Sequence, residues 1–223
     1  MGLDRNEAHS SCCRAFYRYA LTQAPELKPA ALGMLGHGID PHCVDYYADE
    51  HWQQGPRGWC FQQGTPYIPQ VIAACRLPAE WGLWKSHNLV EMACELLLEQ
   101  HDPSLSQELL QAAGDSQAQG VLAQGLSRCF GLEEKRVRRS LAMLPEIFAI
   151  DRPTARSLGE KYRLSLERIH QIQQADAEAI AALIVQIQQE KGEGFWPWSR
   201  QVSGLVKANL TTYQQNFTPD QEG

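Results

Sequence analysis

The sequence predicts a mainly α-helical protein with a turn-rich N-terminal domain, a helical domain with one or two helix-turn-helix units, and a long helix. Apolar residues recur at helical spacing from about residue 86 onward, whereas glycine, proline and aromatic residues are frequent between Pro25 and Pro78. We therefore expect a domain of unknown role over residues 1–85, a helical domain over residues 86–194, and a C-terminal tail with a short helix over residues 195–223.

Composition places the chain among ordinary globular proteins. Its 223 residues are 43% hydrophobic and 21% charged. The apolar runs are shorter than the roughly 20 residues that a membrane span needs, and the N-terminus lacks the apolar segment of a secretion signal. Seven cysteines at irregular spacing favour reduced thiols. We expect a cytoplasmic protein with no membrane segment.

Two segments of the N-terminal domain have readable patterns. Cys13, Phe16, Tyr17 and Ala20 fall at helical spacing and predict a short helix over residues 10–23. Residues 67–72 fit either the start of a helix that runs from Pro69 towards residue 75 or a short strand. The remainder of the region to residue 78 predicts turns and short helices.

The helical domain divides at its capping and breaking residues. Ser86 is a candidate cap for a helix to about residue 100, which the Asp102-Pro103 pair ends. Gly114 ends the next helix, and Asp115 or Ser116 caps the one after it. The predicted helices cover residues 86–100, 105–113, 116–126, 133–144, 154–163 and 166–191.

The last of these helices is the long one. Its apolar residues keep to one side, and Gly192 and Gly194 are expected to end it. A short helix through Val202 and Leu210 would follow in the tail. The apolar side of the long helix must pack on the N-terminal domain or on a second subunit, which is our reason for expecting a homodimer.

Charge is unevenly distributed along the chain. The formal net charge is −6, but the segment from Arg128 to His170 has ten basic and six acidic residues, a net charge of +4. The rest of the chain therefore carries −10. A local positive surface attracts phosphate whatever the overall sign. An ordinary solvated charged face is the alternative explanation.

A helix-turn-helix pattern occupies residues 156–172 within this basic segment. Leu158 and Tyr162 lie one helical turn apart and would face the core, and Leu164 would fill the turn. Ser165 would cap a second helix, which Ile169 would hold against the core. The first turns of that second helix would then face the major groove.

These residues resemble the promoter-reading helix-turn-helix in region four of bacterial primary sigma factors. The matching text is Leu158-Gly159-Glu160, Leu164-Ser165, Glu167-Arg168-Ile169 and Gln171-Ile172. The resemblance covers about residues 154–176 and implies sequence-specific binding of double-stranded DNA. Leu166 and His170 stand where the sigma pattern usually has basic residues, and the N-terminal half has no counterpart of the sigma region that melts the promoter and binds its other element. The resemblance therefore implies a DNA-binding transcriptional regulator rather than a working sigma factor.

A similar pattern occurs 32 residues upstream. Leu126, Phe130 and Leu132 repeat the spacing of Leu158, Tyr162 and Leu164. This repetition predicts a second helix-turn-helix near residues 121–144, and its second helix is rich in basic residues. The alternative is that any two amphipathic helix pairs align in this way.

The two patterns define the predicted DNA contacts. Base edges would be contacted from the first turns of the second helix in the sigma-like unit, by Glu167, Arg168, His170 and Gln171. Phosphates would be contacted by basic residues of both units: Arg128, Lys135, Arg136, Arg138, Arg139, Arg156, Lys161 and Arg163.

Signals for other chemistry are weak. Zinc ligands typically occur in tight pairs along the sequence, and among the N-terminal histidines and cysteines His9-x2-Cys12 comes nearest to such a pair. A small acidic and histidine group is formed by Asp45, Asp49, Glu50 and His51. Ordinary surface charge explains this group as well as a catalytic site would. The sequence has no phosphate-binding or nucleophile motif. We expect no metal, cofactor or catalytic residue, and the alternative function is an adaptor that docks on RNA polymerase or another regulator.

Overall fold

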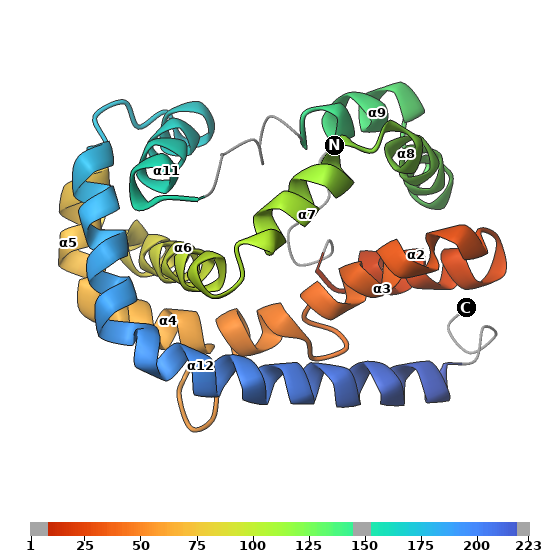
Figure 1. Cartoon of the computed structure of the whole chain (residues 1–223), viewed down its shortest axis with the longest axis horizontal. Helices are drawn as coiled ribbons and strands as arrows, with labels where there is room; N and C mark the ends of the chain where they lie inside the picture. The colour runs from red at the N-terminus through yellow and green to blue at the C-terminus, as the bar shows by residue number, and fades with distance from the viewer. Residues whose placement is uncertain (1–8, 145–152, 218–223) are drawn as a thin grey trace. The chain divides into compact units, whose positions relative to one another are not determined.

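The structure, a computed structural model, describes residues 9–144 and 153–217 and is helical almost throughout (Figure 1). No strand occurs among these residues, so the expectation of a mainly α protein is confirmed. Residues 67–72, for which a strand was an alternative, belong to helical segments. The N-terminal region is also mostly helical, and its glycines and prolines separate short helices rather than long turns.

The chain forms two compact units, each built from segments that are distant in sequence. The first unit contains residues 1–50, 110–149 and 199–223, and the second contains residues 51–109 and 150–198. These boundaries differ from the linear division expected from the sequence. The elements of the first unit are α2 (Ser11–Thr22), η1 (Pro25–Leu27), α3 (Lys28–His37), the π-helical turn η2 (Tyr46–Glu50), α8 (Ser116–Phe130) and α9 (Glu134–Ala142). Those of the second are α4 (Trp59–Gly64), η3 (Thr65–Tyr67), α5 (Ile68–Cys75), η4 (Ala79–Trp81), α6 (Gly82–His101) and α11 (Ala155–His170).

Two further helices belong to both units. They are α7 (Ser104–Gly114) and α12 (Ala177–Asn216). The break expected at Asp102 is confirmed, because Asp102 ends α6, and its side chain also accepts hydrogen bonds from Ser104 at the start of α7. Ser86, by contrast, lies inside α6 and caps nothing. Helix α6 begins four residues earlier, at Gly82.

The core of the first unit lies between α2, η1, α3 and α8. The side chains predicted to form the inner face of α2 are buried, with Phe16 and Ala20 completely inaccessible. Phe16 stacks on Phe130 of α8 at a ring separation of 6.2 Å. A β-carbon at Gly125 would lie 2.1 Å from a terminal methyl group of Leu27, so α8 and η1 pack closely at this point. Helix α8 is therefore fixed on the core of its unit.

The second unit is built around tryptophans and a close helix crossing. Trp59 of α4 stacks on Trp198 of α12 at a ring separation of 4.7 Å, and Trp52 meets Trp198 edge-on. Helices α4 and α6 cross at Gly64, where a β-carbon would lie 2.9 Å from the backbone of Ser86. These three indoles are buried.

The long helix is displaced from its predicted position. It was expected over residues 166–191, but α12 covers Ala177–Asn216. Gly192 and Gly194 do not end it, although each costs about 1 kcal/mol of helix propensity. Beyond them Phe195, Trp198 and Val202 are buried, and burial of such side chains stabilises by about 1.5–3 kcal/mol each. Tertiary packing thus outweighs the propensity of the two glycines.

Pro197 lies inside α12, next to the boundary between the two units. Proline has no amide hydrogen to donate to the carbonyl four residues earlier, so the helix lacks one hydrogen bond there. The apolar side of the N-terminal half of α12 is buried within the chain itself, with Ile180, Ile184 and Ile187 completely inaccessible. This burial removes the reason for which the sequence suggested a homodimer, and the homodimer stays a prediction.

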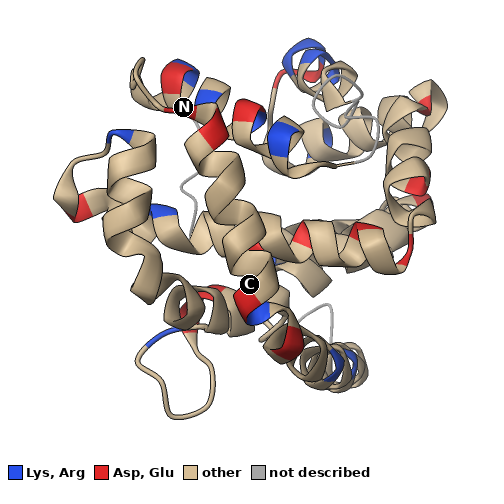
Figure 2. Cartoon of the chain, turned by 60° about the vertical axis from the view of Figure 1, so that its left-hand side comes forward, with Lys and Arg blue, Asp and Glu red and all other residues tan. Residues whose placement is uncertain are grey.

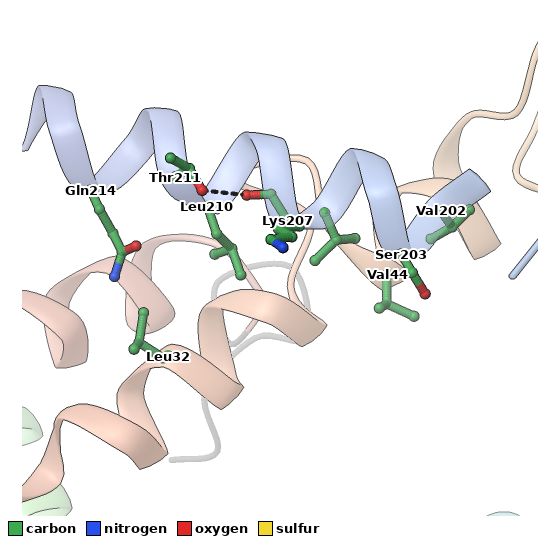
Figure 3. Close-up of a pocket in the computed structure, with 9 residues that line it drawn as sticks. Leu32, Val44, Val202, Ser203, Lys207, Leu210, Thr211 and Gln214 are labelled. Atoms are coloured by element: carbon green, nitrogen blue, oxygen red, sulfur yellow. Dashed lines mark hydrogen bonds between the residues drawn. The ribbon is translucent and has the colours of Figure 1, made fainter. Parts of the chain in front are cut away.

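A shallow groove of about 460 Å³ runs along the C-terminal half of α12 in the first unit (Figure 3). Leu32, Val44 and Leu210 give it an apolar lining, and Lys207 is the one ionisable residue among its described lining residues. Among the described helices, none combines the length and the apolar character that a bilayer crossing requires.

Candidate nucleic-acid interface

Helices α8 and α9 form a helix-turn-helix with a turn of three residues. Gly131 adopts the left-handed conformation, with φ of 64°, and ends α8. Ser127 holds the turn twice: its carbonyl accepts from the amide of Leu132 at 3.1 Å, and its hydroxyl donates to the carbonyl of Leu132 at 2.6 Å. Glu133 is the N-cap residue of α9. Two helices joined by a three-residue turn therefore occupy the region where the second helix-turn-helix was predicted.

The first helix of this pair is anchored and the second is exposed. Asp115 caps α8 by accepting from the amides of Gln117 and Ala118 at 2.9 and 3.0 Å. Leu122 and Leu126 pack against the core of the first unit. Helix α9 has no fully buried residue. The side chain of Arg138 reaches back over α8, because a β-carbon at Gly120 would lie 3.3 Å from its guanidinium.

The exposed surface of α9 is basic. Four of its nine residues are Lys or Arg and one is acidic, which gives the helix a net charge of +3. Arg138 pairs with Glu134 at 2.7 Å, and both side chains are about half exposed. Such an exposed pair contributes little to stability and is easily exchanged for a phosphate. The four predicted phosphate contacts on this helix, all exposed, are Lys135, Arg136, Arg138 and Arg139.

Arg128 adds a fifth basic side chain to the same helix pair. It lies in the last turn of α8 and is exposed. Figure 2 shows acidic residues beside basic ones on several helices. Among the described helices α9 has the largest positive excess, +3 in nine residues, while α2 and α11 each have a net charge of +2.

The prediction of a turn at Leu164 and Ser165 in the sigma-like unit is wrong. Helix α11 runs without interruption from Ala155 to His170, so Leu164 and Ser165 lie in the middle of a helix. Thr154 and Ser157 form a capping box at its start, and neither Gly nor Pro stands between residues 160 and 170. Leu158, Tyr162 and Leu166 are all buried, and their spacing of four residues places them on one face of the continuous helix.

The predicted base-contacting residues consequently lie at the end of a helix rather than at its start. Glu167 and Arg168 are exposed in the last turn of α11, and Gln171 is its left-handed C-cap, with φ of 59°. The carbonyl end of a helix has partial negative charge, which disfavours an approaching phosphate. Ile169, expected to hold the second helix against the core, is 70% exposed.

His170 has contacts inside the second unit. Its ring meets Trp81 edge-on at 5.1 Å, and its Nε2 lies 2.9 Å from Nζ of Lys85. Burial, and then the charge of Lys85, lower the pKa of His170 below its usual value. The imidazole is therefore neutral at pH 7, with Nε2 accepting a hydrogen bond from the ammonium group. This contact gives His170 a role in packing.

The remaining predicted phosphate contacts lie on α11. Arg163 stands between two carboxylates, at 2.7 Å from Glu160 and 2.9 Å from Glu167. Arg156 lies 3.6 Å from Glu178. Lys161 is half-buried. Acidic neighbours thus offset part of the basic charge of α11, whereas α9 has a single acidic residue.

The actual turn between α11 and α12 comprises residues 171–176. Asp176 caps α12 by accepting from the amides of Glu178 and Ala179 at 3.0 and 3.1 Å. Gly159 allows the two helices to meet, because a β-carbon there would lie 2.5 Å from the carbonyl oxygen of Ala177. Sequence reasoning missed this cap, although Asp followed by an apolar periodic segment is an ordinary N-terminal signal.

Comparisons with protein-family models, curated proteins and solved structures found no match to the chain.

Proposed function

We propose that the protein binds double-stranded DNA through the α8–α9 helix pair, as a transcriptional regulator, with α9 directed towards the duplex. The observation that carries the proposal is the exposed basic surface of α9 beyond a three-residue turn. A helix of this kind, held by a first helix on a core, is how helix-turn-helix proteins present side chains to the major groove.

The contacts divide into two groups by chemistry. Lys135, Arg136 and Arg139 are exposed donors suited to phosphate oxygens, and Arg138 joins them when it leaves Glu134. An arginine that enters the major groove also has the planar donor pair that recognises guanine. Arg128 of α8 would contact the phosphates that flank this groove.

The proposal moves DNA recognition from the sigma-like segment to the upstream unit. Glu167, Arg168, His170 and Gln171 are at the carbonyl end of α11, and Arg163 is occupied by two glutamates. We therefore assign α11 to the packing of the second unit. The α8–α9 turn supports a DNA-binding function on geometry and charge alone, without the sigma-like motif.

A salt titration of duplex binding tests the proposal. Fluorescence anisotropy of a labelled duplex would be measured with full-length protein between 50 and 200 mM salt. Counterion release predicts that the logarithm of the affinity falls by about 0.9 per phosphate contact for each tenfold rise in salt. With four to five contacts the slope is roughly −4. A slope near zero would exclude phosphate contacts and favour the adaptor function.

A further inference from the structure

Two imidazoles and one carboxylate meet in the first unit, outside the α8–α9 pair. Nδ1 of His9 contacts Oδ2 of Asp45, and Nδ1 of His37 lies 3.3 Å from the other oxygen of Asp45. One ligand atom from each of the three residues lies within 4.8 Å of the other two. We propose that His9, His37 and Asp45 form a binding site for a divalent transition-metal cation such as zinc.

The donor set has the composition that such cations prefer. Imidazole nitrogen and carboxylate oxygen bind zinc and its first-row neighbours at about 2.0–2.2 Å. In a tetrahedral site of that size, neighbouring ligand atoms are roughly 3.3 Å apart. The distance between His37 and Asp45 already has this value, and rotation of the His9 ring opens its shorter contact with Asp45.

The backbone fixes the three ligands before any cation arrives. The carbonyl of His9 accepts from the amide of Ile39 at 2.8 Å. A β-carbon at Gly38 would lie 2.5 Å from the carbonyl oxygen of His9, so only glycine permits this approach. The segment before α2 is thereby held against the end of α3, where His37 stands. Preorganisation of this kind is what distinguishes a built site from a chance meeting of side chains.

The segment that carries Asp45 is also held. Asn209 of α12 donates to the carbonyl of His42 at 2.7 Å and to the hydroxyl of Tyr47 at 2.9 Å. These two bonds bracket Asp45 on both sides in sequence. The carboxylate therefore comes from a helical turn that is held on both sides.

The electrostatic setting favours a cation. Asp45 is 8% exposed, so its negative charge gains more from a bound cation than an exposed carboxylate would. His37 is the last residue of α3, and the carbonyl end of a helix attracts positive charge. The neighbouring basic residue Arg14 is paired with Asp40.

The thiols of Cys13 and Cys43 are buried in the same unit and lie outside the cluster of ligand atoms. The ligand set is one of nitrogen and oxygen. Since the His37 side chain is 64% exposed, one side of the site faces solvent and leaves room for a coordinated water.

Metal titration of the full-length protein, freed of metal with a chelator, tests the site. Zn²⁺, Co²⁺ and Ni²⁺ would each be titrated by calorimetry, and Co²⁺ would also be followed by its visible absorption. We expect one equivalent to bind. His37→Ala should weaken binding by about tenfold or more, and it should leave folding intact because His37 is exposed. Asp45→Asn should weaken binding at least as much.

His42→Ala is the matched control, since His42 lies in the same unit, stacks on Tyr46 at 3.6 Å and is outside the cluster. It should bind metal as the unmodified protein does. Zinc should also raise the melting temperature of the unmodified protein and not that of His37→Ala. Failure of all three metals to bind, or equal binding by His37→Ala, would overturn the proposal. Loss of binding in His42→Ala to the same extent would do so too. DNA binding is measured separately and depends on other residues.

Discussion

The α8–α9 and α11–α12 pairs share a spacing of core residues but differ in where the chain turns. Helix α8 ends at a left-handed glycine and α9 begins three residues later. Helix α11 passes straight through the corresponding position and ends at Gln171, with α12 beginning after Asp176. The spacing of apolar residues therefore does not define a turn. A turn is marked instead by a residue that accepts a left-handed conformation, followed by a residue at which a new helix can begin.

The pairs differ equally in what they leave exposed. Helix α9 presents basic side chains with few acidic neighbours, whereas Arg163 of α11 is held between Glu160 and Glu167. The first turns of α12, where a recognition helix would present its contacts, include the fully buried Ile180. The comparison assigns phosphate binding to the first pair and packing to the second.

The largest effect is expected from the charges of α9. Arg136→Ala combined with Arg139→Ala should lower the affinity for any duplex by about 10- to 100-fold and flatten the salt slope by roughly 1.8, since two phosphate contacts are lost. Anisotropy at several salt concentrations measures both quantities.

Arg163→Ala is the control for this double variant, because its guanidinium is already occupied by two carboxylates. It should change duplex affinity less than twofold. If Arg163→Ala lost as much duplex affinity as the double variant, the basic charge of the whole segment 128–170 would act in binding rather than that of α9.

The contact between α11 and α12 should be sensitive to size. Gly159→Ala places a methyl group against the carbonyl of Ala177 and should destabilise the protein by about 1–3 kcal/mol, the usual cost of overpacking. Urea unfolding measures the change. The duplex affinity of the folded protein should be unchanged, and a specific loss of binding would return α11 to the DNA interface.

The α8–α9 turn should be sensitive to backbone conformation. Gly131→Ala forces a left-handed alanine and should cost about 1 kcal/mol of stability, although there is space for the methyl group. Gly114→Ala, at the end of α7 and also in open space, should be neutral or slightly stabilising. If both variants behave alike in urea unfolding, the left-handed turn does not define this pair.

The smallest effect is expected from the residues that the sigma-like motif would use. Arg168→Ala combined with Gln171→Ala should change duplex affinity less than twofold, because both side chains lie at the carbonyl end of α11. Anisotropy with the duplex used for the α9 variant measures it. A tenfold loss would restore the sigma-like segment as the reader.

Sequence reasoning succeeded where a signal was local and failed where packing decided. The helix near residues 10–23, the break at Asp102 and the cap at Asp115 follow from spacing and capping chemistry, and the structure contains all three. Ser165 was a plausible cap, but the buried series of Leu158, Tyr162 and Leu166 kept α11 continuous. The glycines of α12 were plausible ends, and the burial of Phe195 and Trp198 outweighed them.

The proposed metal cluster lay beyond any local pattern. His9 and Asp45 are 36 residues apart, and only the backbone contacts around Gly38 bring them together. Neither short ligand spacing nor a paired motif marks them in the sequence. The basic residues of α9, by contrast, are close together in sequence. A single exposed helix is therefore enough to bring the predicted phosphate contacts together.

Selection of bound sequences from a random duplex pool tests the central claim most directly. The unmodified protein and the Arg136→Ala, Arg139→Ala double variant would be compared at moderate salt. Assignment of DNA recognition to α9 predicts an enriched motif with the unmodified protein and its loss with the variant. Enrichment of the same motif by both proteins, or retention of no duplex by the unmodified protein at low salt, would contradict it.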